Sequence, residues 1–253
     1  MRTPLIVANW KMNHGIAETL KFMTGLKKEM TFVSNVEIVI CPPFTSLYSL
    51  SVALSEQKTF NIGAQNCHWE KNGAFTGEIS PLFLKELECD YVLLGHSERR
   101  HVFGETNEMI QKKTRAVLDC ELKPIVCIGE KLEERESKQT LNIIGDQLTC
   151  TLKFITPEEM ESVTIAYEPV WAIGTGLNAT PGQAEEVHLF IRNEVKRIFG
   201  EKTGQKIRLL YGGSVKADNA AQLMKETDID GLLVGGASLT LDSFMKIVQY
   251  QKN

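Results

Sequence analysis

Five short segments of the sequence place acid–base or anion-binding residues directly behind apolar runs. In one of them, Glu168 follows the run 163–167 and opens an apolar loop containing glycines, which leads to a helix start at Thr180-Pro181. Apolar loop residues without a core of their own are typical of a lid that closes over a ligand. A carboxylate beneath such a lid loses hydration and becomes a stronger base toward a carbon acid. Glu168 is therefore a candidate general base, with a surface glutamate beside a helix-covering loop as the alternative.

A candidate acid lies behind the run 91–94, in the segment Gly95-His96-Ser97-Glu98-Arg99. If the chain turns into a helix after His96, the imidazole lies near free amide donors, which favour the neutral ring. A neutral imidazole can donate a hydrogen bond to a carbonyl oxygen and later return a proton. The arginines that follow also fit a structural salt-bridge patch. Ser97 is not expected to be a nucleophile, because Arg99 replaces the closing glycine of a G-x-S-x-G elbow.

A candidate cation follows the run 5–8, where the chain reads Asn9-Trp10-Lys11. Strand alternation predicts that Asn9 and Lys11 face one way and Trp10 the other. A lysine directed into an enclosed site is costly to desolvate unless an anion or a carboxylate pairs with it. An ordinary surface lysine just past a strand fits this segment equally well.

The only two Gly-Gly pairs of the chain, Gly212-Gly213 and Gly235-Gly236, follow the runs 207–211 and 231–234. Glycine lets the backbone approach a ligand closely and leaves N–H groups free to point at it, and a following helix adds partial positive charge. Two ligand-free tight turns are the alternative, but their recurrence favours a phosphate site. The spacing Gly174-x-Gly176 fits a dinucleotide fingerprint only loosely, since it does not directly follow a strand, so a nucleotide is not expected.

The elements that must position these residues recur along the chain with a regular spacing. Eight short apolar runs mostly lack alternation, which is typical of strands buried on both faces of a parallel sheet. They cover residues 5–8, 37–41, 60–64, 91–94, 124–128, 163–167, 207–211 and 231–234. Segments with helical spacing, such as 16–30, 106–120, 141–154 and 185–199, separate several of them.

This spacing predicts an α/β fold, a (β/α)8 barrel of eight parallel strands that forms a single domain over residues 1–253. The chain provides about 32 residues per strand–helix unit, as such a barrel requires. A doubly wound open sheet with a small second domain is the main alternative, and the lack of a linker disfavours it. In a parallel barrel, active-site residues project from the carboxyl ends of the strands, where the candidates above are found.

Composition excludes several classes of partner. Lys plus Arg is 28 and Asp plus Glu is 32, a net charge of −4. We therefore expect no nucleic-acid and no membrane partner, because both need a basic excess. No apolar stretch approaches the ~18 residues of a membrane helix, and the first apolar run is too short for a secretory signal. The six cysteines form no C-x-x-C pair and the histidines are scattered, so we expect reduced thiols, a cytoplasmic location and no metal.

Taken together, five segments resemble the triosephosphate isomerase family. They occur in order through the whole chain, and the first three are highly specific to that family. The segments are Asn9-Trp10-Lys11-Met12-Asn13, Leu94-Gly95-His96-Ser97-Glu98-Arg99-Arg100, Ala166-Tyr167-Glu168-Pro169-Val170-Trp171-Ala172-Ile173-Gly174-Thr175-Gly176, Tyr211-Gly212-Gly213-Ser214-Val215 and Val234-Gly235-Gly236-Ala237-Ser238-Leu239.

The resemblance implies an isomerase of glycolysis and gluconeogenesis that needs no cofactor. It would interconvert dihydroxyacetone phosphate and D-glyceraldehyde 3-phosphate through an enediolate. Glu168 would move the proton between adjacent carbons, His96 would act as the neutral electrophile, and Lys11 would supply positive charge. The remaining implied site residues are Asn9 as an orienting group, Glu98 as the partner of Lys11, and backbone amides of Gly174, Ser214, Gly235 and Gly236 around the phosphate.

The resemblance also implies a lid from Val170 to Asn178 and a homodimer formed through the loop from Gln65 to Glu78. Leu177-Asn178 and Gly182 depart from the family pattern at the carboxyl-terminal hinge of the lid. Two other functions remain open at this stage. One is an aldolase-type lyase with Lys11 as a Schiff-base nucleophile, and the other is a non-catalytic protein that binds a sugar phosphate.

Overall fold

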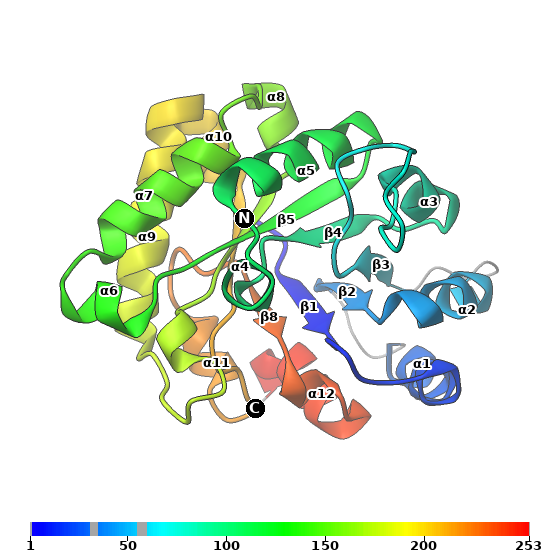
Figure 1. Cartoon of the computed structure of the whole chain (residues 1–253). Coiled ribbons are helices and arrows are strands. Elements are labelled where there is room, and N and C mark those ends of the chain that lie inside the picture. Colours follow the sequence, from blue (N-terminus) through cyan, green and yellow to red (C-terminus); the bar gives the residue numbers. More distant parts are fainter. Residues whose placement is uncertain (1, 31–34, 55–59, 253) are drawn as a thin grey trace.

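The strands close into a parallel barrel in the order of the sequence, from β1 to β8 (Figure 1). The structure is a computed structural model that describes residues 2–30, 35–54 and 60–252. Leu5 pairs with both Glu37 and Gly231, so β1 joins β2 on one side and β8 on the other. The predicted (β/α)8 barrel is confirmed. The strands are β1 (Leu5–Asn9), β2 (Glu37–Cys41), β3 (Asn61–Ala64), β4 (Tyr91–Leu94), β5 (Lys123–Ile128), β6 (Thr164–Tyr167), β7 (Arg208–Tyr211) and β8 (Gly231–Val234).

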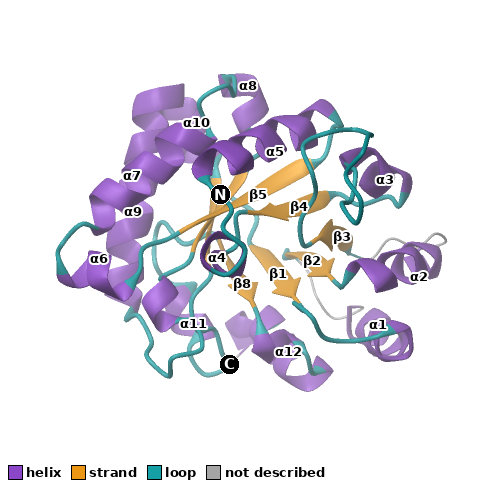
Figure 2. Cartoon of the chain, in the orientation of Figure 1, coloured by secondary structure: helices purple, strands orange, loops and turns teal. Residues whose placement is uncertain are grey.

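Helices surround the strands on the outside of the barrel (Figure 2). They are α1 (Ile16–Met30), α2 (Phe44–Leu54), α3 (Pro81–Glu86), α4 (Ser97–His101), α5 (Asn107–Asp119), α6 (Leu132–Glu136), α7 (Thr140–Thr151), α8 (Pro157–Met160), α9 (Pro181–Phe199), α10 (Glu201–Lys206), α11 (Ala220–Leu223) and α12 (Leu241–Val248). Within the described residues, the helical elements also include three short 3₁₀ turns, namely η1 (Val170–Ala172), η2 (Gly236–Ser238) and η3 (Tyr250–Lys252).

Local sequence explains where α9 begins. The Thr180 hydroxyl accepts from the Gln183 amide at 3.2 Å, and the Gln183 side chain accepts from the Thr180 amide at 2.9 Å. This reciprocal capping satisfies two amide donors at the helix end, and Pro181 fits the first helical position, which needs no donor. The start predicted at Thr180-Pro181 is confirmed. Ser80 also caps α3, directly before Pro81.

The core has an inner and an outer layer because successive strand residues point to opposite faces. Val7, Val39, Leu93 and Cys127 belong to the cluster inside the barrel. The alternate positions, such as Ile6, pack between the strands and the helices. Both faces are therefore buried, which explains the lack of alternation in the sequence.

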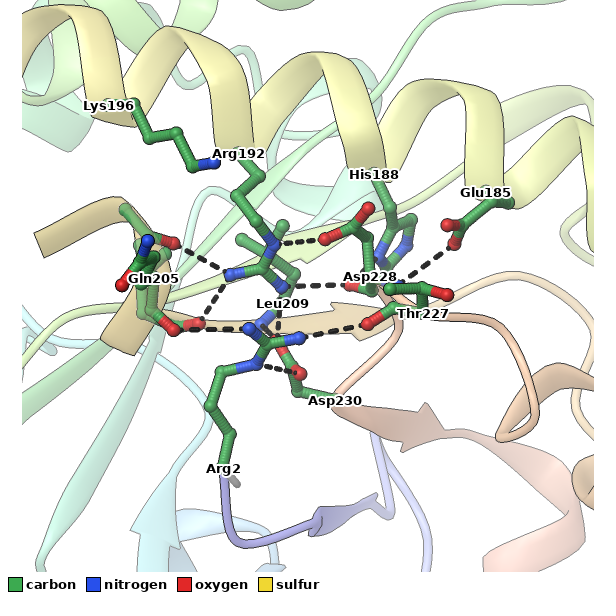
Figure 3. Close-up of polar contacts among 12 residues, drawn as sticks. Arg2, Glu185, His188, Arg192, Lys196, Gln205, Leu209, Thr227, Asp228 and Asp230 are labelled. Carbon is green, nitrogen blue, oxygen red and sulfur yellow. Dashed lines mark hydrogen bonds and ion pairs between the residues drawn. The ribbon is translucent and has the colours of Figure 1, made fainter. Parts of the chain in front are cut away.

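The amino ends of the strands are held by an ion-pair group that we call the Arg192 cluster, consisting of Arg2, Arg192, Asp228 and Asp230 (Figure 3). The Arg192 guanidinium on α9 pairs with Asp228 and, at 2.7 Å, with Asp230. It also donates to the carbonyl oxygens of Gly204 and Ile207 at 2.9 and 3.0 Å. The cluster fixes α9 and α10 against β7 and β8 at the end of the barrel opposite to the candidate residues.

All six cysteines lie in the described ranges, and all six are free. This agrees with the expectation of reduced thiols. Within residues 2–30, 35–54 and 60–252, no helix is long and apolar enough to cross a membrane.

Candidate active site

A cavity of about 330 Å³ opens at the carboxyl ends of the strands. Every catalytic and substrate-binding residue expected from the sequence lines it, and they come from the segments that follow β1, β4, β6, β7 and β8. The full lining is Asn9, Lys11, His96, Glu168, Ile173, Gly174, Gly212, Gly213, Ser214, Val215, Lys216, Leu233, Gly235, Gly236 and Ala237.

Glu168 lies on the floor of this cavity and is almost fully buried, with 2% of its surface exposed. One carboxylate oxygen accepts from the Ser97 amide at 2.8 Å, and the other lies 3.0 Å from His96 Nε2. The position of Glu168 depends on two neighbouring glycines, Gly129 and Gly212. A Cβ at Gly129 would lie 1.7 Å from the Glu168 carbonyl oxygen, and one at Gly212 would lie 2.9 Å from its Cγ. The backbone around Glu168 therefore has no room for a side chain at Gly129.

His96 is the N-cap of α4, and this position determines which ring nitrogen accepts a hydrogen bond. Its Nδ1 accepts from the Glu98 amide at 3.3 Å. A ring that accepts at Nδ1 carries its single proton on Nε2 and is neutral. The Nε2–H therefore points at the Glu168 carboxylate, and the pair holds a base and a neutral donor side by side.

Lys11 reaches the cavity in a different way from the one predicted. Strand β1 ends at Asn9, and Lys11 has φ of 51°, in the left-handed region. Strand alternation therefore does not extend to Lys11, although the side chains of Asn9 and Lys11 both line the cavity. The Lys11 amide donates to Asn9 Oδ1 at 3.0 Å, and Gln65 Nε2 donates to the Lys11 carbonyl at 2.8 Å. These bonds hold the unusual conformation.

The charge of Lys11 is balanced inside the protein. Its Nζ lies 2.6 Å from a carboxylate oxygen of Glu98, as the resemblance implies. Trp10, between Asn9 and Lys11, is fully buried and stacks edge-on against Phe22 at 5.0 Å. The anchored Trp10 and the Glu98 partner together fix where the ammonium lies.

Two glycine turns form another part of the cavity wall. A Cβ at Gly213 would lie 2.2 Å from the Tyr211 hydroxyl, so only glycine fits there. A Cβ at Gly235 would lie 3.9 Å from Lys11 Nζ, which places the ammonium beside this turn. Among the described residues, no backbone oxygen outside the regular helices and strands accepts from the Ser214, Gly235 or Gly236 amides. Free amides beside an ammonium group suit a phosphate.

The predicted lid lies directly behind Glu168. It begins with η1, and residues 174–178 are exposed, while Ile173 and Gly174 contribute to the cavity wall. Trp171 Nε1 donates to Glu130 Oε1 at 2.9 Å, and this oxygen also accepts from the Tyr167 hydroxyl at 3.1 Å. The amino end of the lid is thus tied to a buried carboxylate.

Sequence reasoning missed two charged residues at this site. Glu130, which binds Trp171 of the lid, follows β5 after one glycine, so a search for carboxylates just behind apolar runs could have found it. Lys216 lines the cavity just past the Gly212-Gly213 turn, but no local pattern marks it. Cys127, which belongs to the cluster inside the barrel, is fully buried. Its burial raises the pKa of the thiol, and the charge of Glu168 raises it further.

The fold and the cavity define a (β/α)8-barrel protein with a buried carboxylate–imidazole pair facing an anion-binding turn, suited to acid–base chemistry on a small anion. The protein-family model for triosephosphate isomerase matches residues 4–251 of this chain. The chain belongs to the triosephosphate isomerase family.

Relatives in the family align over almost the whole chain. A triosephosphate isomerase of Endomicrobium trichonymphae is 50% identical over 252 residues, which is 100% of both chains. Those of Alkaliphilus metalliredigens and Aquifex aeolicus are 49% and 51% identical. The alignments cover 99% and 96% of this chain and 100% and 98% of these relatives.

Proposed function

We propose that this chain interconverts dihydroxyacetone phosphate and D-glyceraldehyde 3-phosphate, a step of glycolysis and gluconeogenesis, with Glu168 as the base. The observation that carries the proposal is the contact of 3.0 Å between the Glu168 carboxylate and His96 Nε2, in a cavity whose wall also includes two glycine turns. A base beside a neutral donor is what a proton shift between adjacent carbons needs. The pairing of a glutamate base with a neutral histidine is a known feature of triosephosphate isomerases, so it is not a new finding for this chain.

In the proposed mechanism, Glu168 removes a proton from the carbon next to the substrate carbonyl. His96 Nε2–H donates to the carbonyl oxygen, on which negative charge develops, and the Lys11 ammonium stabilises the resulting enediolate. His96 gives its Nε2 proton to the former carbonyl oxygen and takes up the proton of the neighbouring hydroxyl, while Glu168 returns its proton to the former carbonyl carbon, so that the carbonyl moves to the adjacent carbon. Because the Nε2–H now donates to Glu168, substrate binding has to displace that contact before His96 reaches a substrate oxygen.

The phosphate would occupy the part of the cavity lined by the two glycine turns. Backbone amides of Gly174, Ser214, Gly235 and Gly236 would donate to its oxygens, and Asn9 would orient the substrate beside Lys11. Closure of the lid from Val170 to Asn178 would exclude water and keep the enediolate from expelling phosphate. Glu98 would hold the Lys11 ammonium in place throughout.

We also propose that two copies form a homodimer through the loop from Gln65 to Glu78. Gln65, at the root of this loop, bonds to the Lys11 carbonyl, and Phe75 at its tip is 42% exposed. A second subunit would cover this apolar tip and steady the loop that holds Lys11.

The single domain and the cytoplasmic location are part of the same proposal. The pairing of β1 with β8 supports one domain over residues 1–253, since the ends of the barrel depend on each other. The buried free thiols support a reducing compartment. Burial raises the pKa of the Cys67 thiol to about 12, which keeps it protonated and unreactive.

The substitution Glu168→Gln tests the mechanism because it keeps the shape of the side chain and removes the base. We expect kcat for triose phosphate isomerisation to fall by about 10²–10⁴-fold. Glu158→Gln, at an exposed position of α8, is the matched control and should retain full activity. A Glu168→Gln protein that isomerises at the normal rate would refute the assignment.

Two further assays separate the two other functions. A lyase that uses Lys11 as a nucleophile needs a neutral amine, whereas Lys11 is paired with Glu98 at 2.6 Å. Borohydride reduction in the presence of substrate should therefore leave no adduct on Lys11. A protein that only binds the sugar phosphate would not exchange solvent deuterium into the ligand carbons, and we expect such exchange.

A further inference from the structure

Lys216 is a charged residue of the cavity wall that the proposed mechanism does not use. It is exposed, and it follows the Gly212-Gly213 turn that closes β7. The turn is fixed by Asn219, whose side chain accepts from the Lys216 amide at 2.8 Å and donates to the Ser214 carbonyl at 2.9 Å. The backbone of Lys216 is therefore held on the same rigid turn as a proposed phosphate donor.

The charges around the cavity make Lys216 distinctive. Its lining contains three charged side chains, namely Lys11, Glu168 and Lys216. Lys11 is paired with Glu98, whereas in the described part of the chain Lys216 forms no ion pair within 4.0 Å. Asp218, two residues further on, is an exposed negative charge on the same segment. Without Lys216, the two carboxylates of Glu98 and Glu168 outweigh the single ammonium of Lys11.

We propose that Lys216 is an electrostatic guide at the cavity mouth, which attracts the phosphate of the incoming substrate toward the glycine turns. The inference rests on the proposed function, because it needs an anionic substrate. The chain carries a net charge of −4, so its overall field repels a triose phosphate. A local cation at the mouth of a cleft offsets this repulsion and raises the rate of productive encounter.

This role predicts which kinetic constant responds. Among the described residues, Lys216 makes no hydrogen bond or ion pair to Glu168 or His96, and its side chain is exposed, so it influences capture of the phosphate and not the proton transfer. For Lys216→Ala we expect kcat/KM to fall about three- to fivefold at low ionic strength, with kcat unchanged. Lys216→Glu should lower kcat/KM further, and Lys216→Arg should restore it.

Salt distinguishes guidance from a structural role. The deficit of Lys216→Ala should shrink as ionic strength rises from about 0.01 to 0.3 M, because the Debye length falls below the distances over which the charge acts. Lys225→Ala, at an exposed lysine beyond α11, makes the same change in net charge away from the cavity and is the matched control. A kcat/KM for Lys216→Ala equal to that of the control, or a loss that salt does not alter, would overturn the inference. In the same experiment, the wild-type chain should isomerise triose phosphates and Glu168→Gln should not. This result would show that the proposed function holds whether or not the inference about Lys216 does.

Discussion

Two buried histidines in this protein hold their ring nitrogens in different surroundings. His96 accepts a backbone amide at Nδ1 and presents its proton to Glu168. His188, on α9, is fully buried, and its Nδ1 lies 3.2 Å from the Asp228 carbonyl oxygen, to which it donates. Its Nε2 has no partner among the described residues. Burial lowers the pKa of His188 to about 4, and the charge of Arg192 lowers it further, although the hydrogen bond to the Asp228 carbonyl and the charge of Asp228 act in the opposite direction.

The lowered pKa of His188 predicts an acid-sensitive fold. Well above pH 6.5 the His188 ring is neutral in both the folded and the unfolded chain, so it does not make the free energy of unfolding depend on pH. As pH falls from about 6.5 toward 4, the unfolded chain binds a proton that the folded chain refuses, and the free energy of unfolding drops by up to about 3 kcal/mol. Urea unfolding at fixed protein concentration across this range measures the drop. His188→Gln cannot titrate, so its curve should be flatter, and equal slopes would contradict the prediction.

The helix that carries His188 also anchors the carboxyl end of the lid. Its first turn contains Gly182, one of the departures from the family pattern. A Cβ at Gly182 would meet nothing within 4 Å, and its φ is not positive. Glycine is therefore not required here by space or by backbone geometry. In contrast, Gly176 in the lid has φ of 84°, which other residues rarely adopt.

We expect Gly182→Ala to raise the free energy of unfolding by about 0.5–1 kcal/mol, since alanine restricts the unfolded chain and favours the helix. Gly176→Ala is the matched comparison, because it adds the same methyl group into equally open space. There the left-handed φ should make alanine destabilising by about 1–2 kcal/mol. Thermal or urea unfolding of the two variants measures the difference, and a stabilising Gly176→Ala would contradict the backbone argument.

The elements that the sequence predicted well are those with a strong local signal. Residues 16–30 coincide with α1, and the capping pattern at Thr180 placed the start of α9 better than its apolar stripe did, since the stripe begins only at residue 185. The charged segment of α6 carries no buried residue, so apolar spacing could not reveal it. The left-handed backbone of Lys11 and the place of Lys216 on the cavity wall depend on backbone geometry and on distances through space, which no local pattern encodes.

At the scale of the whole molecule, four exposed apolar side chains lie in segments that follow strands of the first half of the barrel. Met12 follows β1, Phe75 lies between β3 and α3, and Val102 and Phe103 follow α4. Their exposed fractions are 94%, 42%, 73% and 66%, respectively. Strands β1 to β4 are neighbours in the barrel order. Large apolar side chains exposed in neighbouring segments are typical of a protein–protein interface, which supports the proposed homodimer.

Phe75→Glu tests the dimer because it places a charge at the tip of the proposed contact loop. We expect the wild-type chain to sediment at twice the 28.4 kDa of one chain, and Phe75→Glu to sediment as a single chain. The variant should also lose activity, because the root of this loop, through Gln65, holds the carbonyl of Lys11 in its left-handed conformation. Phe154→Glu introduces the same charge at a side chain that is 63% exposed beyond α7, away from the proposed contact loop, and should remain dimeric and active. A wild-type monomer with full activity would remove the dimer from the proposal, and a dimeric, fully active Phe75→Glu would place the contact elsewhere.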